Sequence, residues 1–142
     1  MDALETPVRQ VMTAPLVTVD GDRPLGDVAG QFGRDGVGSL VVRTESGDGI
    51  VTEGDVVAAV AEGIDPSITP VRDVMSAPLV TVPASATLRQ VTERMDSHRV
   101  KHLPVVEDGE VVGIVTSTDV VAALAPNLDE IVRLFAGEPA DT

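Results

Sequence analysis

Two short segments decide the fold: "GIVTEGD" at residues 49–55 and "GIVTSTD" at residues 113–119. Five of the seven letters agree, and both segments have a glycine, two branched apolar residues, a threonine and, three places later, an aspartate. Branched apolar residues favour a buried strand, and threonine followed three places later by an acidic residue is typical of a helix N-terminus. Each segment is therefore predicted to be a strand that leads directly into a helix.

A second pair of matching segments lies upstream of the first pair. "VRQVMTAPLVTV" at residues 8–19 and "VRDVMSAPLVTV" at residues 71–82 are identical at ten of twelve positions, with an offset of 63 residues. The GIVT segments have an offset of 64, so one residue is inserted, most simply in the turn at residues 44–48 or 107–110. Matches at both ends of each unit indicate an internal duplication.

Both copies predict the same order of elements, β-α-β-β-α, preceded by a short helix. A threonine followed by a proline, at residues 6–7 and 69–70, predicts that the threonine caps this short helix and the proline is its first residue. The other expected elements are strands at 15–19, 39–42 and 49–52 and helices at 24–33 and 53–61 in the first copy, and strands at 78–82, 103–106 and 111–116 and helices at 87–98 and 117–124 in the second.

The two copies are expected to form one α+β module. Units of about 60 residues with such short strands bury too little surface to be stable alone. The motifs at residues 7–62 and 70–124 are therefore predicted to pack sheet to sheet about a pseudo-twofold axis. Residues 125–142 form a C-terminal helix and tail, with an amphipathic helix predicted at 126–136.

Composition narrows the classes of function. The chain has no cysteine, so disulfides and thiol nucleophiles are excluded. The formal charge of −13 repels phosphate backbones, which argues against general nucleic-acid binding. No apolar run reaches the ~20 residues of a membrane span, and the N-terminus lacks an apolar signal core, so a soluble, cytoplasmic protein is expected. The acid-rich, lysine-poor composition is similar to that of halophilic proteins.

Two interpretations of the T-x-x-D pattern stay open from the residues alone. In the first, Thr52 with Asp55, and Thr116 with Asp119, only cap a helix. In the second, the free amides at the helix start and the threonine hydroxyl bind a phosphate, and the aspartate binds ribose hydroxyls. Local sequence does not decide between a cap and a nucleotide site.

The doubled segments resemble the CBS motif, named for cystathionine beta-synthase. The resemblance rests on "VMTAPLVTV" and "VMSAPLVTV", on "VGSLVV" and "VKHLPVV", and on "GIVTEGD" and "GIVTSTD". The three segments occur in the order typical of the CBS motif, and they occur in both copies. The chain is therefore similar to a stand-alone tandem pair of CBS motifs, often called a Bateman module. The resemblance implies clefts between the motifs that bind adenosine-containing ligands such as AMP, ADP, ATP, NAD or S-adenosylmethionine.

The resemblance also implies roles for individual residues. Asp55 and Asp119 are expected to bind ribose, and Thr52, Thr116, Lys101 and His102 to lie on the phosphate side. The implied base pockets consist of Thr13, Pro15, Leu16 and Val37 from the first copy and Ser76, Pro78, Leu79 and Val100 from the second. Because these clefts are composite, Asp119 is expected to act with Leu16 and Val37, and Asp55 with Leu79 and Val100.

The two copies differ at the positions that are expected to contact the phosphate groups of a ligand. Lys101, the chain's one lysine, and His102 align with Gly38 and Ser39 of the first copy. Lysines are mostly solvated surface residues, so the alternative for Lys101 is an ordinary exposed side chain. The difference predicts two unequal sites.

An enzyme is not expected, because neither copy has a nucleophile–base set and no acidic cluster with metal-ligand spacing lies beside His98 and His102. No metal or catalytic cofactor is expected either. Two functions remain: a regulatory sensor of an adenine nucleotide, and a scaffold that keeps the fold but binds no ligand. The resemblance further implies a homodimer, a disc of four motifs, that signals to an unknown effector protein.

Overall fold

The computed structural model describes residues 2–125, so the helix predicted at 126–136 and the tail lie outside the described residues. The chain divides into two compact units. Unit 1 comprises Met1–Pro15 and Thr81–Thr142, and unit 2 comprises Leu16–Val80.

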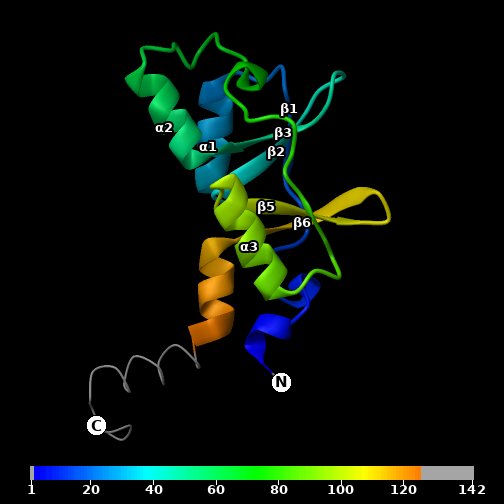
Figure 1. Ribbon diagram of the computed structural model, residues 1–142. Coiled ribbons are helices and arrows are strands. Elements are labelled where there is room, and N and C mark those ends of the chain that lie inside the picture. Colours follow the sequence, from blue (N-terminus) through cyan, green and yellow to red (C-terminus); the bar gives the residue numbers. More distant parts are fainter. Residues whose placement is uncertain (1, 126–142) are drawn as a thin grey trace, which may run out of the picture. The chain divides into compact units, whose positions relative to one another are not determined.

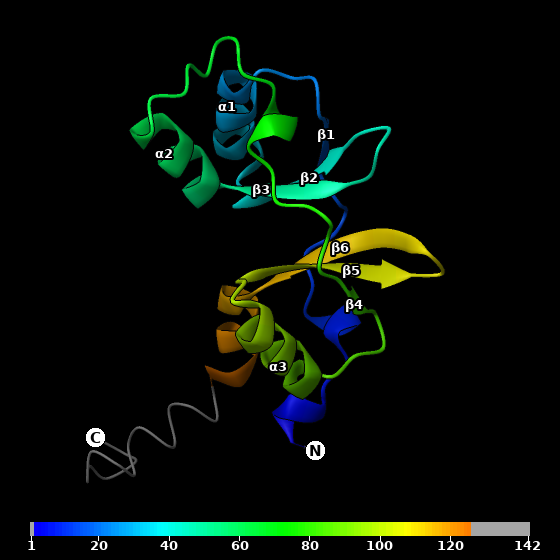
Figure 2. The same ribbon diagram turned by 45° about the horizontal axis from the view of Figure 1, so that its top comes forward.

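Unit 2 is a three-stranded sheet with two α-helices. Its elements are β1 (Thr18–Asp20), α1 (Leu25–Asp35), β2 (Ser39–Arg43), β3 (Gly49–Thr52), α2 (Glu53–Ala61) and the 3-10 helix η3 (Val71–Asp73). The strand order is β1-β2-β3, with β1 parallel and β3 antiparallel to β2. Both α-helices lie on the same face of the sheet (Figures 1 and 2).

Unit 1 repeats this arrangement. Its elements are the 3-10 helices η1 (Ala3–Glu5) and η2 (Val8–Gln10), β4 (Val82–Pro83), α3 (Leu88–His98), β5 (His102–Glu107), β6 (Glu110–Thr116) and a helix described over residues 117–125. The strand order is β4-β5-β6, again with one parallel and one antiparallel pair. The α+β class and the duplicated order of elements are confirmed.

The compact units do not coincide with the sequence repeats, because the segments in front of β1 and β4 are exchanged. The first repeat's leading segment belongs to unit 1, where the Val8 amide donates to the Ala86 carbonyl at 2.7 Å. The second repeat's leading segment belongs to unit 2, where the Val71 amide donates to the Arg23 carbonyl at 2.8 Å. Val8 and Val71 are both fully buried.

The prediction for the start of these leading segments was wrong in detail. The helices η2 and η3 have only three residues, and Pro7 and Pro70 are their N-caps rather than their first helical residues. The threonines before them cap no helix with their side chains. Instead, the Thr6 carbonyl accepts from the first amide of α3 at 3.0 Å, and the Thr69 carbonyl accepts from the first amide of α1 at 2.8 Å.

The first strand of each copy is also shorter than predicted, since only its C-terminal end pairs with a neighbour. Strand β1 begins at Thr18 and β4 at Val82. Pro15 and Pro78 have no amide proton to donate to a ladder, although this alone does not exclude a proline from a strand, since Pro83 lies in β4 and Pro104 in β5. The peptide bonds that precede both prolines are cis.

The extra residue of the second copy lies at a β-bulge in the β5–β6 ladder, not in the turn that joins these two strands. The β5–β6 register shifts between Val105 and Val106, because Val105 pairs with Gly113 whereas Val106 pairs with Val111. The connecting turn is Asp108-Gly109, with φ of 52° and 82°. Positive φ at both residues is typical of the two-residue hairpin turn that Asp-Gly favours.

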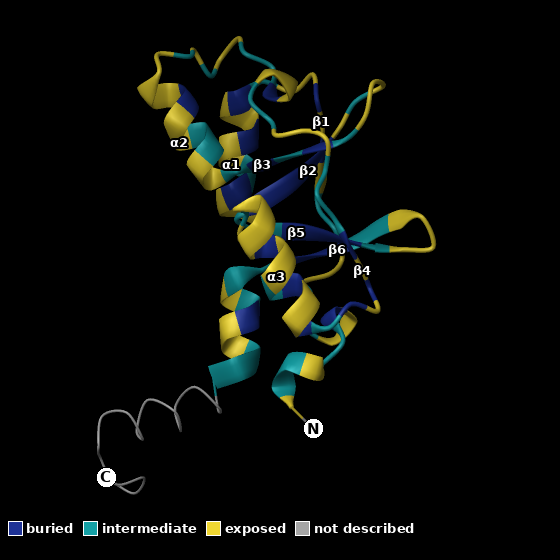
Figure 3. Ribbon diagram, viewed as in Figure 1, coloured by how far each residue is buried: buried dark blue, intermediate teal, exposed yellow. Residues whose placement is uncertain are grey.

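Each unit buries one face of its first α-helix. Leu25, Val28 and Phe32 of α1 are buried, as are their counterparts Leu88, Val91 and Met95 of α3. The spacing of three and four residues forms one apolar stripe, and the central strands β2 and β5 are mostly buried (Figure 3). Burying a side chain of this size contributes about 1.5–3 kcal/mol.

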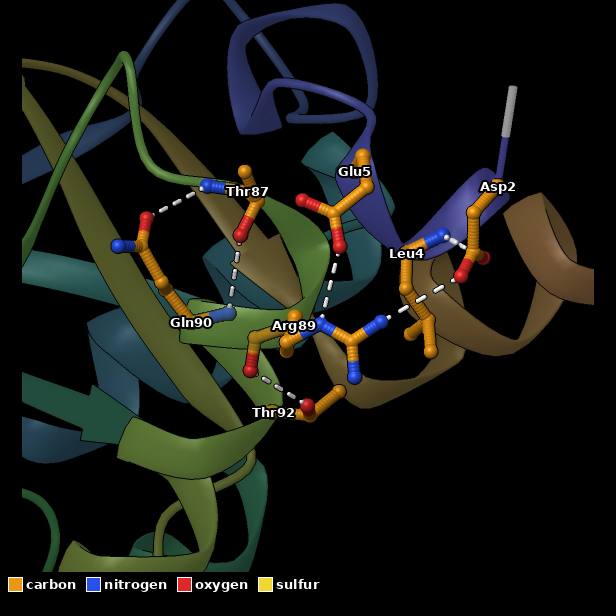
Figure 4. A network of polar contacts seen from close by, with 7 residues as sticks. All are labelled: Asp2, Leu4, Glu5, Thr87, Arg89, Gln90 and Thr92. Atoms are coloured by element: carbon orange, nitrogen blue, oxygen red, sulfur yellow. Dashed lines mark hydrogen bonds and ion pairs between the residues drawn. The ribbon is translucent and has the colours of Figure 1, made fainter.

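Within unit 1, Arg89 of α3 binds two acidic residues of the N-terminal segment (Figure 4). Its Nε donates to Glu5 Oε1 at 3.0 Å, and its Nη2 donates to Asp2 Oδ2 at 3.4 Å. The hydrogen bond from Arg89 to Glu5 and the charge of Glu5 raise the pKa of the Arg89 guanidinium. Next to it, Thr87 and Gln90 form a capping box at the start of α3.

Candidate functional site

In unit 2, strand β3 passes directly into α2 at Thr52. The Asp55 amide donates to Thr52 Oγ1 at 3.2 Å, and the Thr52 amide donates to Asp55 Oδ2 at 2.9 Å. This is a complete capping box with aspartate in its last place. The cap fixes both side chains at the helix start, next to the positive end of the helix dipole.

Unit 1 has the same junction at Thr116, where β6 meets the helix over 117–125. The Asp119 amide donates to Thr116 Oγ1 at 3.1 Å, and the Thr116 amide donates to Asp119 Oδ2 at 2.9 Å. A threonine oxygen that accepts still has its own proton to donate, and a carboxylate has a second oxygen. The capping interpretation is therefore correct for both junctions, and a cap of this kind leaves ligand-binding atoms available.

The exchanged leading segments pair with the strands that enter these junctions. In unit 2, Ile50 and Ser76 exchange two backbone hydrogen bonds of 2.8 and 2.9 Å. In unit 1, Ile114 and Thr13 exchange two of 2.8 and 3.1 Å. The threonine or serine of one repeat thus lies beside the T-x-x-D strand of the other repeat.

The glycine that opens each GIVT segment allows this close approach. A Cβ atom at Gly49 would lie 2.6 Å from Met75 Sδ and 2.7 Å from the Ser76 carbonyl oxygen. At Gly113 it would lie 2.8 Å from both Met12 Sδ and the Thr13 carbonyl oxygen. Side chains do not tolerate contacts this short, so both positions require glycine.

Lys101 and His102 lie next to the junction of unit 1. His102 is the ladder partner of Thr116, and the Ser117 amide donates to the Lys101 carbonyl at 3.0 Å. Lys101 is exposed and His102 is half-buried. Lys101 also lines a pocket of about 480 Å³ in unit 1, together with Val100.

The junction of unit 2 has no cation at these places. Ser39 is the ladder partner of Thr52, and the Glu53 amide donates to the Gly38 carbonyl at 3.2 Å. Where unit 1 has Ser117 as its first helical residue, unit 2 has Glu53, which is exposed. This second difference was not predicted, although the alignment of the two T-x-x-D patterns contains it.

The predicted binding residues are divided between the units. Unit 1 contains Thr13, Pro15, Val100, Lys101, His102, Thr116 and Asp119, and unit 2 contains Leu16, Val37, Thr52, Asp55, Ser76, Pro78 and Leu79. Each unit therefore combines a T-x-x-D pair with residues of the other repeat's leading segment. The expected action of Asp119 with Leu16 and Val37, and of Asp55 with Val100, involves residues of different units and stays a prediction.

Another pocket, of about 740 Å³, lies at the hairpin end of unit 2. Both arginines that line it are already paired, Arg72 with Asp22 and Arg43 with Asp48. Among residues 2–125, no group of three or more His, Asp or Glu side chains could hold a metal ion. No helix in the described part of the chain is long and apolar enough to cross a membrane.

Two α+β units with the same capped strand-to-helix junction define a tandem-repeat module. The family model of the CBS domain matches residues 8–62 and 71–126, and the chain belongs to this family. The CBS domain-containing protein YhcV of Bacillus subtilis is 31% identical over 115 residues, which cover 79% of this chain and 81% of YhcV.

Solved structures have the same fold. The CBS-domain containing protein ATU1752 from Agrobacterium tumefaciens is 32% identical, with a TM-score of 0.77 over 87% of this chain and 96% of that chain. The CBS domain pair of protein MJ0100 was crystallised in complex with methylthioadenosine and S-adenosyl-L-methionine. It is 24% identical, with a TM-score of 0.76 over 86% of this chain and 98% of that chain.

Proposed function

We propose that this CBS pair is a non-enzymatic regulatory module that binds adenosine-containing ligands, AMP, ADP or ATP first among them, and signals their presence to a partner protein. The capped junctions are the observation that carries the proposal. Each one presents a threonine hydroxyl and an aspartate that are fixed by a cap but keep atoms for a ligand. The adenosine compounds in the MJ0100 complex support the ligand class.

The site in unit 1 is the better phosphate site of the two. Lys101 and His102 flank its junction, and Ser117 opens its helix, so a phosphate meets the lysine cation, an imidazole, a hydroxyl and helix amides. In unit 2 the exposed carboxylate of Glu53 occupies the helix start and repels a phosphate. Unit 2 therefore favours adenosine compounds with little or no negative charge, such as S-adenosylmethionine.

The test is a panel of AMP, ADP, ATP, NAD and S-adenosylmethionine, measured by thermal shift and calorimetry at high salt. A ligand at a hundred times its Kd stabilises the native state by about 2.7 kcal/mol. Asp119→Ala should abolish most binding of AMP, and Asp55→Ala should affect it less. Equal losses in both variants would contradict the unequal sites.

Gln90→Ala is the matched control, because Gln90 completes the capping box of α3 but lies at neither T-x-x-D junction. This variant should lose stability without losing ligand affinity. The specific alternative is a scaffold that binds nothing, which the completed capping boxes would equally serve. A panel in which no adenosine compound raises the melting temperature would favour the scaffold.

We also propose that the protein is a cytoplasmic homodimer. Exposed valines on α2 and on the helix over 117–125 support the homodimer, because exposed apolar surfaces commonly mark protein contacts.

A further inference from the structure

Each leading segment places one methionine beside the strand that enters a T-x-x-D junction. Met12 and Met75 are equivalent residues of the nearly identical segments at 8–19 and 71–82. Both side chains are half-buried, and the residue that follows each of them is exposed. The other methionine within residues 2–125, Met95 of α3, is only 8% exposed. Met12 and Met75 are therefore more accessible to a small solute than Met95 is.

Each of these two sulfur atoms fills the space beside the glycine of a GIVT segment. A Cβ atom on Gly113 would lie 2.8 Å from Met12 Sδ, and a Cβ atom on Gly49 would lie 2.6 Å from Met75 Sδ. Met75 also packs against the hydrophobic core of unit 2. An unbranched, apolar thioether suits a narrow slot of this kind. An oxygen atom added to the sulfur would enter a closely packed contact.

The backbone groups next to each methionine are already paired. Ser76 follows Met75, and its amide and carbonyl are both bonded to Ile50, at 2.8 and 2.9 Å. Thr13 follows Met12, and its amide and carbonyl are bonded to Ile114 in the same way, at 2.8 and 3.1 Å. These bridges therefore have no spare amide proton to offer to an oxygen atom on the neighbouring sulfur.

We propose that Met12 and Met75 are sites of reversible oxidation by peroxides, and that the sulfoxide loosens each leading segment from its T-x-x-D strand. One oxygen atom of hydrogen peroxide forms a bond to the thioether sulfur, the O–O bond breaks, and the other oxygen leaves as water. The thioether is oxidised by two electrons, and the peroxide is reduced by two. The product is a polar sulfoxide, and burying its oxygen without a hydrogen-bond donor costs free energy.

The two oxidation sites act on different junctions. Met12 belongs to unit 1 and Met75 to unit 2. Ile114 and Ile50, the bridge partners, each lie two residues before the threonine that caps the following helix. A sulfoxide that leaves its slot weakens the bridge and frees the end of the strand in that unit. The inference concerns the attachment of the leading segments, and it holds whether or not a nucleotide binds.

The first test measures which methionines react. The folded protein is treated with hydrogen peroxide, and the oxidised peptides are followed over time by mass spectrometry. Met12 and Met75 should be oxidised at least about tenfold faster than Met95, because oxidation follows exposure. Met95 is thus an internal control. Equal rates at the three methionines, or no reaction at Met12 and Met75, would overturn the proposal.

The second test measures what the sulfoxides do to the fold. Oxidation should lower the melting temperature by about 5 °C or more, and the Ile50 and Ile114 amides should exchange faster with deuterium. Methionine sulfoxide reductases with a dithiol reductant should reverse both effects. This comparison of oxidised and repaired wild-type protein needs no variant. Sulfoxides at Met12 and Met75 that leave the melting temperature and the amide exchange unchanged would contradict the loosening.

A variant without the two sulfur atoms assigns the effect to them. M12L/M75L keeps apolar side chains of similar volume, and its own melting temperature should not change in peroxide. Met95→Leu is the matched control and should respond to peroxide as the wild type does. If M12L/M75L lost as much stability in peroxide as the wild type, the two methionines would not be the responsible sites. Nucleotide binding is measured separately, with the panel of adenosine compounds.

Discussion

Units 1 and 2 have the same backbone at their strand-to-helix junctions but different charges around them. The four capping hydrogen bonds agree within 0.1 Å between Thr52–Asp55 and Thr116–Asp119. The neighbouring positions are Lys101 and His102 in one unit and Gly38 and Ser39 in the other. The two junctions therefore share the capping residues that folding requires. They differ in the neighbouring residues that a ligand or partner would contact. Substitutions in matched pairs can test this separation.

The largest expected effect comes from the two glycines. Gly49→Ala and Gly113→Ala should each lower the free energy of unfolding by about 1–3 kcal/mol, because the new Cβ atoms would collide with backbone carbonyls of the leading segments. Urea denaturation followed by circular dichroism measures both. Similar losses would support equal roles for the two leading segments.

The control for this pair is Gly33→Ala in α1, where a Cβ atom would meet nothing within 4 Å. Replacing an exposed helical glycine by alanine should raise stability by up to about 1 kcal/mol. If Gly33→Ala were as destabilising as the junction variants, the close approach would not be the cause of the loss.

A smaller effect is expected from the capping threonines. Thr52→Ala and Thr116→Ala should each cost about 1 kcal/mol, the usual loss for an N-cap hydroxyl. Without ligand, the two variants should be equally destabilised in thermal unfolding, since their hydrogen bonds are alike. With AMP present, Thr116→Ala should lose more of the ligand-induced stabilisation than Thr52→Ala.

Serine substitutions separate the two roles, because Thr52→Ser and Thr116→Ser keep the hydroxyl and should retain both cap and ligand response. A Thr116→Ala variant that responds to AMP as well as the wild type would show that the unit 1 junction is only a cap.

The sequence predicted those features that depend on local chemistry. Helix α2 runs over Glu53–Ala61 as predicted, since Thr52 and Asp55 give an unambiguous cap. The β-α-β-β-α order followed from the duplicated segments. The first strands were predicted too long, because the apolar pattern begins at Pro15 and Pro78 whereas the strands begin at Thr18 and Val82.

The exchange of leading segments is not encoded locally. Val8 and Val71 are equivalent, fully buried residues of nearly identical segments, so their local sequence does not indicate which unit each segment joins. Which unit each segment joins depends on the connections along the whole chain, and that information lies outside any short window. The pairing of Ile50 with Ser76 and of Ile114 with Thr13 depends on the same exchange, so it too could not be obtained from the sequence.

The smallest expected effect concerns the ends of the leading segments, which the units secure differently. Unit 1 uses the Arg89 network, whereas unit 2 uses a turn in which the Ser67 hydroxyl and amide donate to Asp65 Oδ1 at 2.7 and 2.9 Å. These hydrogen bonds, the hydroxyl first, lower the pKa of Asp65 below its ordinary value of 3.8. A lowered pKa stabilises the folded state above pH 3.8, and this contribution disappears as the pH falls through the folded-state pKa.

Ser67→Ala removes the hydroxyl donor but keeps the amide, so it should raise the pKa of Asp65 part of the way back to its ordinary value. An NMR titration of the Asp65 carboxyl measures this directly, and Ser46→Ala, in an exposed turn of the same unit, is the control. The Asp65 carbonyl also accepts from the Thr69 hydroxyl at 2.8 Å, and the Thr69 carbonyl in turn accepts from the first amide of α1. Protonation of Asp65 at a pH below its lowered pKa should therefore loosen this end of unit 2, and an unchanged Asp65 pKa in Ser67→Ala would show that the Ser67 hydroxyl does not secure the turn.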